Sequence, residues 1–193
     1  MTPGRAPRTT LEYALIGLIR ECPRSGYELR KVFVETAMAG YSGSPGAIYP
    51  ALRRLEADGL IEGTERPGGP GRTRREYRLT AAGEAVLQEW LALPVTRDDV
   101  ALRLDELMLR FAFLGYAADS TARTLEFLAS LEAHLEAFLD ELQQQLQAVD
   151  AASRHIPVTH ARLALEAGIS SIADRLRWAR AARARLSSSG EET

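Results

Sequence analysis

Apolar residues recur along most of this chain three or four positions apart, which is the spacing of one face of a helix. The pattern predicts a first helix that begins at the capping residue Thr10. It predicts a second helix that is capped by Ser25 and runs to about Ala37. Residues 40–43, which begin and end with glycine, are predicted as a turn. The chain therefore opens with two amphipathic helices.

A third helix is predicted from Ser44, a capping residue, to Gly59, which suits a left-handed cap. One face of this helix is apolar, and another carries tyrosine and arginine side chains. The second face is unusual for a solvated surface and suits a helix that meets a polyanion. The apolar face holds Ile48, Leu52 and Leu55, and the other face holds Tyr49, Arg53 and the nearby Arg54. Pro50 is unexpected inside a helix, because it lacks an amide donor and crowds the carbonyl of Gly46.

Two strands are predicted directly after the third helix. Residues 60–65 form the first, and the Pro/Gly-rich residues 67–71 form a hairpin tip. Residues 74–79 alternate, so that Tyr77 and Leu79 share one face of the second strand. Helix, strand, glycine-rich turn and basic strand in this order are typical of the recognition helix and wing of a winged-helix DNA-binding domain.

The rest of the chain is predicted to be helical. A fourth helix spans residues 80–90, and residues 93–96 mark a domain boundary. One helix is predicted over residues 100–114, a long helix over about 120–151, and a last helix around 165–179. The long helix carries leucine and valine at heptad spacing, which favours lengthwise packing on partner helices. These heptad positions are Leu128, Leu135, Leu142 and Val149.

The fold class expected from these patterns is mainly α with a small β-hairpin wing. Residues 9–92 are expected to form a winged helix-turn-helix DNA-binding domain. Residues 98–186 are expected to form a C-terminal α-helical dimerisation domain, which is also a candidate for effector sensing.

Charge is divided unevenly between these two parts. The 193 residues carry a formal net charge of -2, with a net of +2 in residues 1–92 and -4 in residues 93–193. A mildly basic front and an acidic rear fit a DNA-binding domain joined to a different domain. Cys22 is the single cysteine, so no internal disulfide forms. The apolar run at 11–19 is too short to span a membrane, and a cytoplasmic protein without membrane contact is expected.

Catalytic and cofactor motifs are missing from the sequence. The three histidines, His134, His155 and His160, have no convincing metal-ligand spacing. The chain contains neither a GxSxG elbow nor an HExxH pair, and its glycine-rich turn lacks the phosphate-loop pattern. We therefore expect no enzyme, no metal and no cofactor.

Five motifs in order resemble the winged-helix domain of PadR-type transcriptional regulators. They lie at residues 11–19, 25–29, 46–56, 58–61 and 74–83. The resemblance covers about residues 10–92 and includes the Tyr49-Pro50 pair. More loosely, residues 163–178 resemble the last helix of the longer PadR subgroup, whose C-terminal helices form the dimer. The resemblance implies a homodimeric, usually repressing, bacterial regulator that responds to a small molecule or stress.

The expected partners are double-stranded DNA with a pseudo-palindromic operator, a second copy of the chain, and a small aromatic or hydrophobic effector. Amides near Gly46 and Ala47 favour a phosphate, and Tyr49 and Arg53 reach the duplex. Tyr27 is a candidate through the family resemblance alone. The wing supplies arginines for the minor groove, although solvated hairpin arginines are the alternative. The candidate DNA-binding residues are Tyr27, Ser44, Gly46, Ala47, Tyr49, Arg53, Arg72, Arg74 and Arg75, with Arg66 beside them.

Three alternatives stay open. The first is a winged-helix regulator of another class, such as a MarR-like one, which is distinguished by where its dimer forms. The second is a winged-helix protein-interaction module, for which Arg72 and Arg74 are dispensable. An enzyme is a distant third. Trp90 and Trp178 either line an effector cavity or serve as buried packing anchors.

Overall fold

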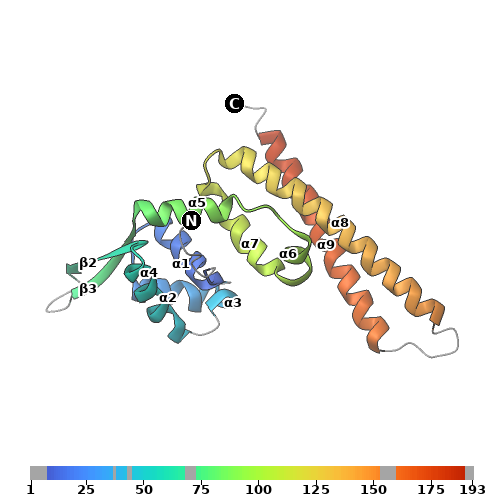
Figure 1. The fold of residues 1–193 in the computed structure, drawn as a ribbon, viewed down its shortest axis with the longest axis horizontal. Helices are drawn as coiled ribbons and strands as arrows, with labels where there is room; N and C mark the ends of the chain where they lie inside the picture. Colours follow the sequence, from blue (N-terminus) through green and yellow to red (C-terminus); the bar gives the residue numbers. More distant parts are fainter. Residues whose placement is uncertain (1–7, 37, 43–44, 68–72, 153–159, 190–193) are drawn as a thin grey trace, which may run out of the picture. The chain divides into compact units, whose positions relative to one another are not determined.

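The structure is a computed structural model, and it is mainly α-helical with a small antiparallel sheet, as predicted (Figure 1). It describes residues 8–36, 38–42, 45–67, 73–152 and 160–189. The chain divides into two compact units, residues 1–91 and residues 92–193, and each is described here by itself.

The N-terminal unit combines helices with a three-stranded sheet in the order β1-β3-β2. Its helices are α1 (Thr10–Glu21), α2 (Gly26–Glu35), α3 (Ala39–Ser42), the 3₁₀ turn η1 (Pro45–Ala47), α4 (Ile48–Ala57) and α5 (Ala81–Leu91). Its strands are β1 (Arg24–Ser25), β2 (Ile61–Pro67) and β3 (Thr73–Leu79). Strands β2 and β3 form the predicted wing, while β1, which the sequence did not predict, pairs with the base of β3.

Reciprocal caps fix the first two helices. The side chain of Ser25 accepts from the amide of Glu28, and Glu28 accepts from the amide of Ser25, which confirms the predicted start of α2. The cap of α1 is Thr9 rather than Thr10, because Glu12 lies three residues after Thr9 and completes the same reciprocal pair. The turn predicted at 40–43 is wrong in part, since residues up to Ser42 belong to the short helix α3.

The third predicted helix is shorter than expected. Its α-helical part begins at Ile48, after the 3₁₀ turn η1, and the predicted cap Ser44 lies outside the described residues. Pro50 is therefore in the first turn of α4, where an amide has no acceptor four residues back. The expectation that Pro50 breaks the rules of helix geometry is wrong for this reason. At the other end, Gly59 adopts φ 71° as the predicted left-handed cap.

The core of the N-terminal unit joins the wing to the helices. The fully buried side chains include Leu15 of α1, Leu29 of α2 and Leu52 of α4. Tyr77 on β3 is buried as predicted. At Gly83 in α5, an added Cβ would lie 2.1 Å from the carbonyl oxygen of Leu60, so only glycine permits this approach of α5 to the start of the wing.

The C-terminal unit is wholly helical within its described residues. Its elements are α6 (Arg97–Leu102), α7 (Leu104–Phe113), the 3₁₀ turn η2 (Leu114–Tyr116), α8 (Ser120–Ala152) and α9 (His160–Ser189). The single helix predicted over residues 100–114 is wrong, because the chain leaves helical geometry at Arg103. Thr96 and Asp99 form a reciprocal cap at the start of α6, so α6 is a separate short helix.

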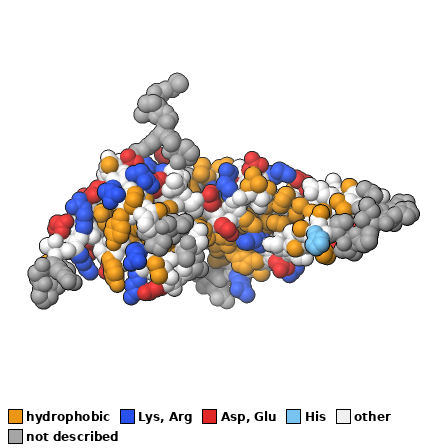
Figure 2. All heavy atoms as spheres, turned by 90° about the horizontal axis from the view of Figure 1, so that it is seen from below, with side chains coloured by type: hydrophobic (Ala, Val, Ile, Leu, Met, Phe, Trp, Pro, Cys, Tyr) orange, Lys and Arg blue, Asp and Glu red, His pale blue; other side chains and the backbone are white. Residues whose placement is uncertain are grey.

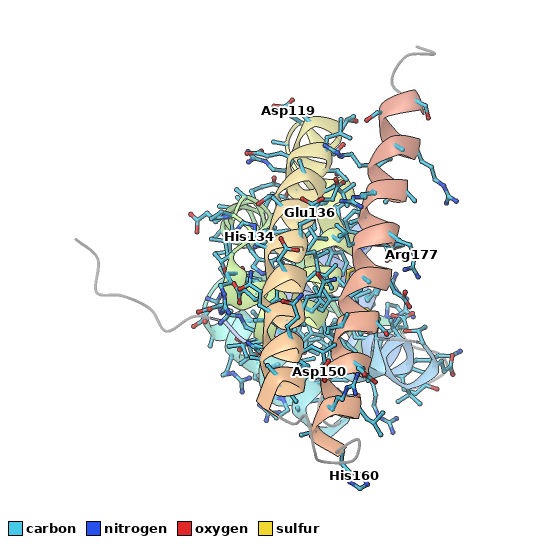
Figure 3. The ribbon with its side chains drawn as sticks, turned by 90° about the vertical axis from the view of Figure 1, so that its right-hand side faces the viewer. Asp119, His134, Glu136, Asp150, His160 and Arg177 are labelled. Carbon is cyan, nitrogen blue, oxygen red and sulfur yellow. The ribbon has the colours of Figure 1, made fainter. Side chains whose placement is uncertain are left out.

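Helices α8 and α9 lie side by side and antiparallel (Figure 3). Asp150 near the end of α8 pairs with Arg162 near the start of α9, at 3.2 Å. Within the predicted heptad seam, Leu128 and Leu135 are fully covered, but Leu142 and Val149 are only half-buried. The distal half of this helix pair thus leaves part of its apolar seam exposed. Over the described stretches, no helix is long and apolar enough to cross a membrane.

Candidate nucleic-acid interface

The first turn of α2 and the first turn of α4 present two exposed tyrosines. Tyr27 is 67% exposed and Tyr49 is 43% exposed. The two helix starts touch at Gly26, where an added Cβ would lie 2.7 Å from Cε1 of Tyr49. The absence of a side chain at Gly26 therefore lets the Tyr49 ring lie directly against α2. This contact places the start of α2, which carries Tyr27, and the start of α4 on one surface.

Arg53 lies one helical turn after Tyr49 and extends the same face of α4. Its side chain is exposed, and it forms no ion pair with any residue that the structure describes. Arg54 differs, because its Nε lies 2.9 Å from Oε1 of the buried Glu12 on α1. The predicted polar face therefore keeps Tyr49 and Arg53, whereas Arg54 serves the packing of α4 on α1.

The Glu12 carboxylate is stabilised in its charged form. Burial on its own would raise the pKa of Glu12. Hydrogen bonds from the Thr9 amide and from Arg54 outweigh burial, so the pKa of Glu12 lies below its ordinary value. The charged pair between Glu12 and Arg54 therefore links α1 to α4.

Gly46 and Ala47 lie in the 3₁₀ turn that leads into α4. Ala47 is the N-cap residue of α4, and it provides no side-chain hydrogen bond to the helix amides. Gly46 is exposed and Ala47 is half-buried. The positive, amide end of the helix dipole therefore lies at this turn, where it favours the binding of an anion. Ser44, which was predicted beside them, lies outside the described residues.

The register of the wing places its arginines on opposite faces. Arg74 on β3 pairs across the ladder with Arg66 on β2, and both share a face with Glu76. Arg75 lies on the other face, together with Tyr77. The remaining predicted wing residue, Arg72, lies outside the described residues.

Carboxylates from the wing and from the helices form ion pairs with Arg74 and Arg75, the two candidate wing arginines that the structure describes. Arg75 lies 2.6 Å from Glu56 at the end of α4 and 3.5 Å from Glu65 on β2. Arg74 lies 3.4 Å from Glu28 on α2 and 3.6 Å from Glu76. Figure 2 shows acidic and basic side chains interspersed over one face of the molecule. The sequence gives a signal for Glu76, two positions from Arg74, but none for Glu28 or Glu56, which only tertiary packing brings there.

Local charges shift the ionisation of two of these groups. Hydrogen bonds from the amide and hydroxyl of Ser25 lower the pKa of Glu28, and Arg74 adds to the effect. The hydrogen bond to Glu56 and its charge raise the pKa of Arg75. Both shifts favour the charged forms of Glu28 and Arg75.

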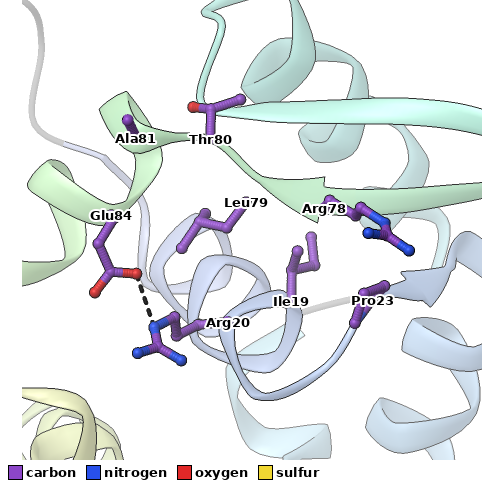
Figure 4. Close-up of a pocket in the computed structure, with 8 residues that line it drawn as sticks. All are labelled: Ile19, Arg20, Pro23, Arg78, Leu79, Thr80, Ala81 and Glu84. Atoms are coloured by element: carbon purple, nitrogen blue, oxygen red, sulfur yellow. Dashed lines mark ion pairs between the residues drawn. The ribbon is translucent and has the colours of Figure 1, made fainter.

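A cavity of about 360 Å³ lies between the end of α1 and the start of α5 (Figure 4). Ile19 and Leu79 form an apolar part of its lining, while Arg78 from the wing is polar. Arg20 and Glu84 form an ion pair of 2.7 Å beside it.

Neither tryptophan belongs to the lining of this cavity. Trp90 is buried and stacks on Tyr13, with ring centroids 4.5 Å apart. Trp178 is partly exposed and meets the ring of Phe111 edge-on at 5.1 Å. The packing interpretation therefore fits Trp90 best.

Part of the N-terminal unit is similar to known proteins. The model of the Transcriptional regulator PadR-like family matches residues 15–89. Transcriptional regulator Rv3488 of Mycobacterium tuberculosis is 53% identical over 55 residues, which are 28% of this chain and 50% of the relative. Negative transcriptional regulator PadR of Bacillus subtilis is 30% identical over 119 residues, which are 60% of this chain and 62% of the relative. The chain thus spans between half and about three fifths of these relatives.

A solved structure of Bacillus subtilis PadR in complex with operator DNA is also similar to this chain. The two are 24% identical, and the alignment covers 93% of this chain and 99% of the other, with a TM-score of 0.44.

Proposed function

We propose that this chain, whose residues 15–89 match the model of the Transcriptional regulator PadR-like family, binds double-stranded DNA and represses transcription as a homodimer. The observation that carries the proposal is the exposed surface formed by Tyr27, Tyr49 and Arg53 at the touching starts of α2 and α4. Such a surface combines hydroxyl donors, a guanidinium that has no carboxylate partner among the described residues, and the positive end of a helix dipole.

The arrangement supports a division of roles on the duplex. Helix α4 enters the major groove, where base edges are distinguishable, and Tyr49 and Arg53 contact bases or backbone. The turn at Gly46 and Ala47 receives a phosphate. The wing follows the adjacent minor groove with Arg74 and, on its other face, Arg75. Ser44 and Arg72 complete the proposed contacts.

The C-terminal unit is proposed to form the homodimer. Its support is the distal part of the α8–α9 pair, where apolar side chains lack full cover. Leu163 is 52% exposed, and Leu142, Val149, Leu165 and Ile169 are only half-buried. A second copy that covers these residues would bury apolar surface. The two recognition helices of the dimer would then read half-sites about 34–36 Å apart.

Relief of repression is proposed to come from a small aromatic or hydrophobic effector. The effector acts only if it binds one geometry of the dimer more tightly than another, because equal affinity for both shifts no population. A compound that binds tightly and leaves operator affinity unchanged is not this effector.

Arg53→Ala tests the proposed DNA surface. Loss of one phosphate contact should weaken binding by about tenfold and reduce the slope of log affinity against log salt by about one unit. Arg103→Ala is the matched control, because Arg103 is an exposed arginine of the C-terminal unit that pairs with Asp99 at 2.8 Å. Fluorescence anisotropy with DNA from upstream of the protein's own gene measures both variants. Equal affinities for Arg53→Ala and Arg103→Ala would contradict the placement of the DNA surface.

A winged-helix module that binds protein is a rival from a different functional class. For that function, substitution of Arg72 and Arg74 by alanine leaves activity intact. A DNA-binding wing instead loses affinity for duplexes of every sequence, because phosphate contacts carry no sequence information.

A further inference from the structure

The described arginines of the proposed DNA surface differ in whether they form ion pairs with carboxylates of the protein. Arg53 on α4 forms no ion pair with the residues that the structure describes, so it is available to a phosphate. Arg74 and Arg75 on the wing each lie within 4 Å of two carboxylates. A phosphate therefore competes with protein carboxylates for either wing arginine.

Two of these four carboxylates come from the helices, while the other two, Glu65 and Glu76, belong to the wing itself. Glu56 ends α4 and reaches Arg75 at 2.6 Å, and Glu28 begins α2 and reaches Arg74 at 3.4 Å. Glu76 is different, because its side chain is only 15% exposed and lies within 4 Å of three arginines. Glu76 is therefore part of the wing's structure, whereas Glu28 and Glu56 connect the wing to α2 and α4.

We propose that Glu28 and Glu56 act as internal substitutes for DNA phosphates, which restrain Arg74 and Arg75 and lower the affinity of the protein for DNA of any sequence. The inference rests on the proposed DNA binding. Phosphate contacts supply most of non-specific affinity, so restrained wing arginines weaken non-specific binding most. Arg53 and Tyr49 keep their full contribution, and the ratio of specific to non-specific binding rises. The pairs also hold the wing against α2 and α4 before DNA arrives.

Glutamine substitutions separate the charge from the structural hydrogen bonds. Oε1 of Glu56 accepts from the amide of Gly63 at 3.0 Å, and the carboxylate of Glu28 accepts from the amide of Ser25 at 2.7 Å. The amide oxygen of glutamine accepts the same bonds. Glu28→Gln/Glu56→Gln therefore removes two charges with little structural change.

The matched control removes the same charge from exposed positions that lack an arginine partner among the described residues. Glu62 on β2 and Glu89 on α5 are exposed and form no ion pair with any part of the chain that the structure describes. Glu62→Gln/Glu89→Gln thus reports the effect of net charge alone. Both double variants and the unmodified chain are titrated against a labelled duplex of mixed sequence, over a series of salt concentrations.

We expect Glu28→Gln/Glu56→Gln to bind the mixed duplex about tenfold tighter than the unmodified chain, the size of two exposed ion pairs. Its salt slope should steepen by one to about two units, because released arginines add phosphate contacts. The control should change affinity by less than about threefold, as expected from screened charges.

A second pair of variants keeps the test valid if the double variant folds poorly. Glu56→Gln alone should tighten binding, and the same substitution in an Arg75→Ala background should have no effect, because its partner is gone. An equal gain in both backgrounds would overturn the inference.

The outcomes also separate the inference from the proposed function. If the unmodified chain binds DNA and Glu28→Gln/Glu56→Gln binds no tighter than the control, the inference alone fails. If none of the variants binds any duplex at low salt, the proposed function and the inference fail together.

Discussion

Gly83→Ala tests the junction that joins α5 to the wing. An added Cβ would lie 2.1 Å from the carbonyl oxygen of Leu60 and 2.5 Å from Cδ1 of Leu79. The Leu79 side chain can rotate, but the Leu60 carbonyl is main chain. That carbonyl also accepts from the amide and from the hydroxyl of Thr80, each at 3.1 Å. The substitution therefore forces α5 away from the start of β2 and breaks both hydrogen bonds.

The expected cost follows from these contacts. Overpacking against main chain costs about 3 kcal/mol, at the upper end for buried sites. Loss of the two hydrogen bonds destabilises the folded state by about 1 kcal/mol each. The better helix propensity of alanine offsets about 1 kcal/mol of this loss. The net loss of about 4 kcal/mol should lower the unfolding temperature of the N-terminal unit by roughly 15–30 °C.

The assay is thermal unfolding followed by tryptophan fluorescence in a Trp178→Phe background. The sequence has two tryptophans, so Trp90, which stacks on Tyr13, then reports the N-terminal unit alone. Gly40→Ala is the control, because an added Cβ at Gly40 meets no described atom within 4 Å. If Gly83→Ala unfolds within about 3 °C of Gly40→Ala, the packing of α5 on the start of the wing is not as described.

Three further predictions concern acid stability, the DNA surface and the dimer. Glu12 has a lowered pKa in the folded chain, so the stability it contributes is present above its unfolded pKa and is lost as pH falls through the folded pKa. Glu12→Gln should therefore flatten the fall in unfolding free energy below about pH 5. An unchanged dependence of unfolding free energy on pH in urea titrations would contradict this. Gly26→Ala moves only the Tyr49 ring, so it should weaken DNA binding by about threefold or more with less than about 1 kcal/mol lost in stability; unchanged anisotropy would argue against a role for Tyr49. Leu142→Glu should convert the proposed dimer to monomers in sedimentation velocity, whereas the exposed Gln144→Glu should not. A Leu142→Glu variant that remains dimeric would place the interface elsewhere.

Local rules were sufficient to predict most elements of the fold. Ser25 and Gly59 mark helix ends in the sequence because capping depends on neighbours within a few residues. The alternation around Tyr77 predicts the second strand of the wing because one of its faces is buried. Tyr49 and Arg53 are exposed where the sequence suggested a polar face, and Tyr27, which only the family resemblance singled out, is exposed as well.

Features that depend on tertiary packing were missed. The apolar repeat continues through Leu104, so the sequence gives no sign that the chain leaves helical geometry at Arg103. The strand β1 has only two residues and exists because β3 lies beside it. The ion pairs of Arg74 and Arg75 with Glu28 and Glu56 join residues 46 and 19 positions apart, and no local rule brings them together.

The central claim is sequence-selective DNA binding, and one titration tests it most directly. The protein is added to DNA from upstream of its own gene and to an unrelated duplex of equal length, and fluorescence anisotropy is recorded over a salt series. The account predicts at least about a thousandfold preference for the upstream DNA, with affinity that falls steeply as salt rises. Equal and weak binding to both duplexes, with little dependence on salt, would contradict it.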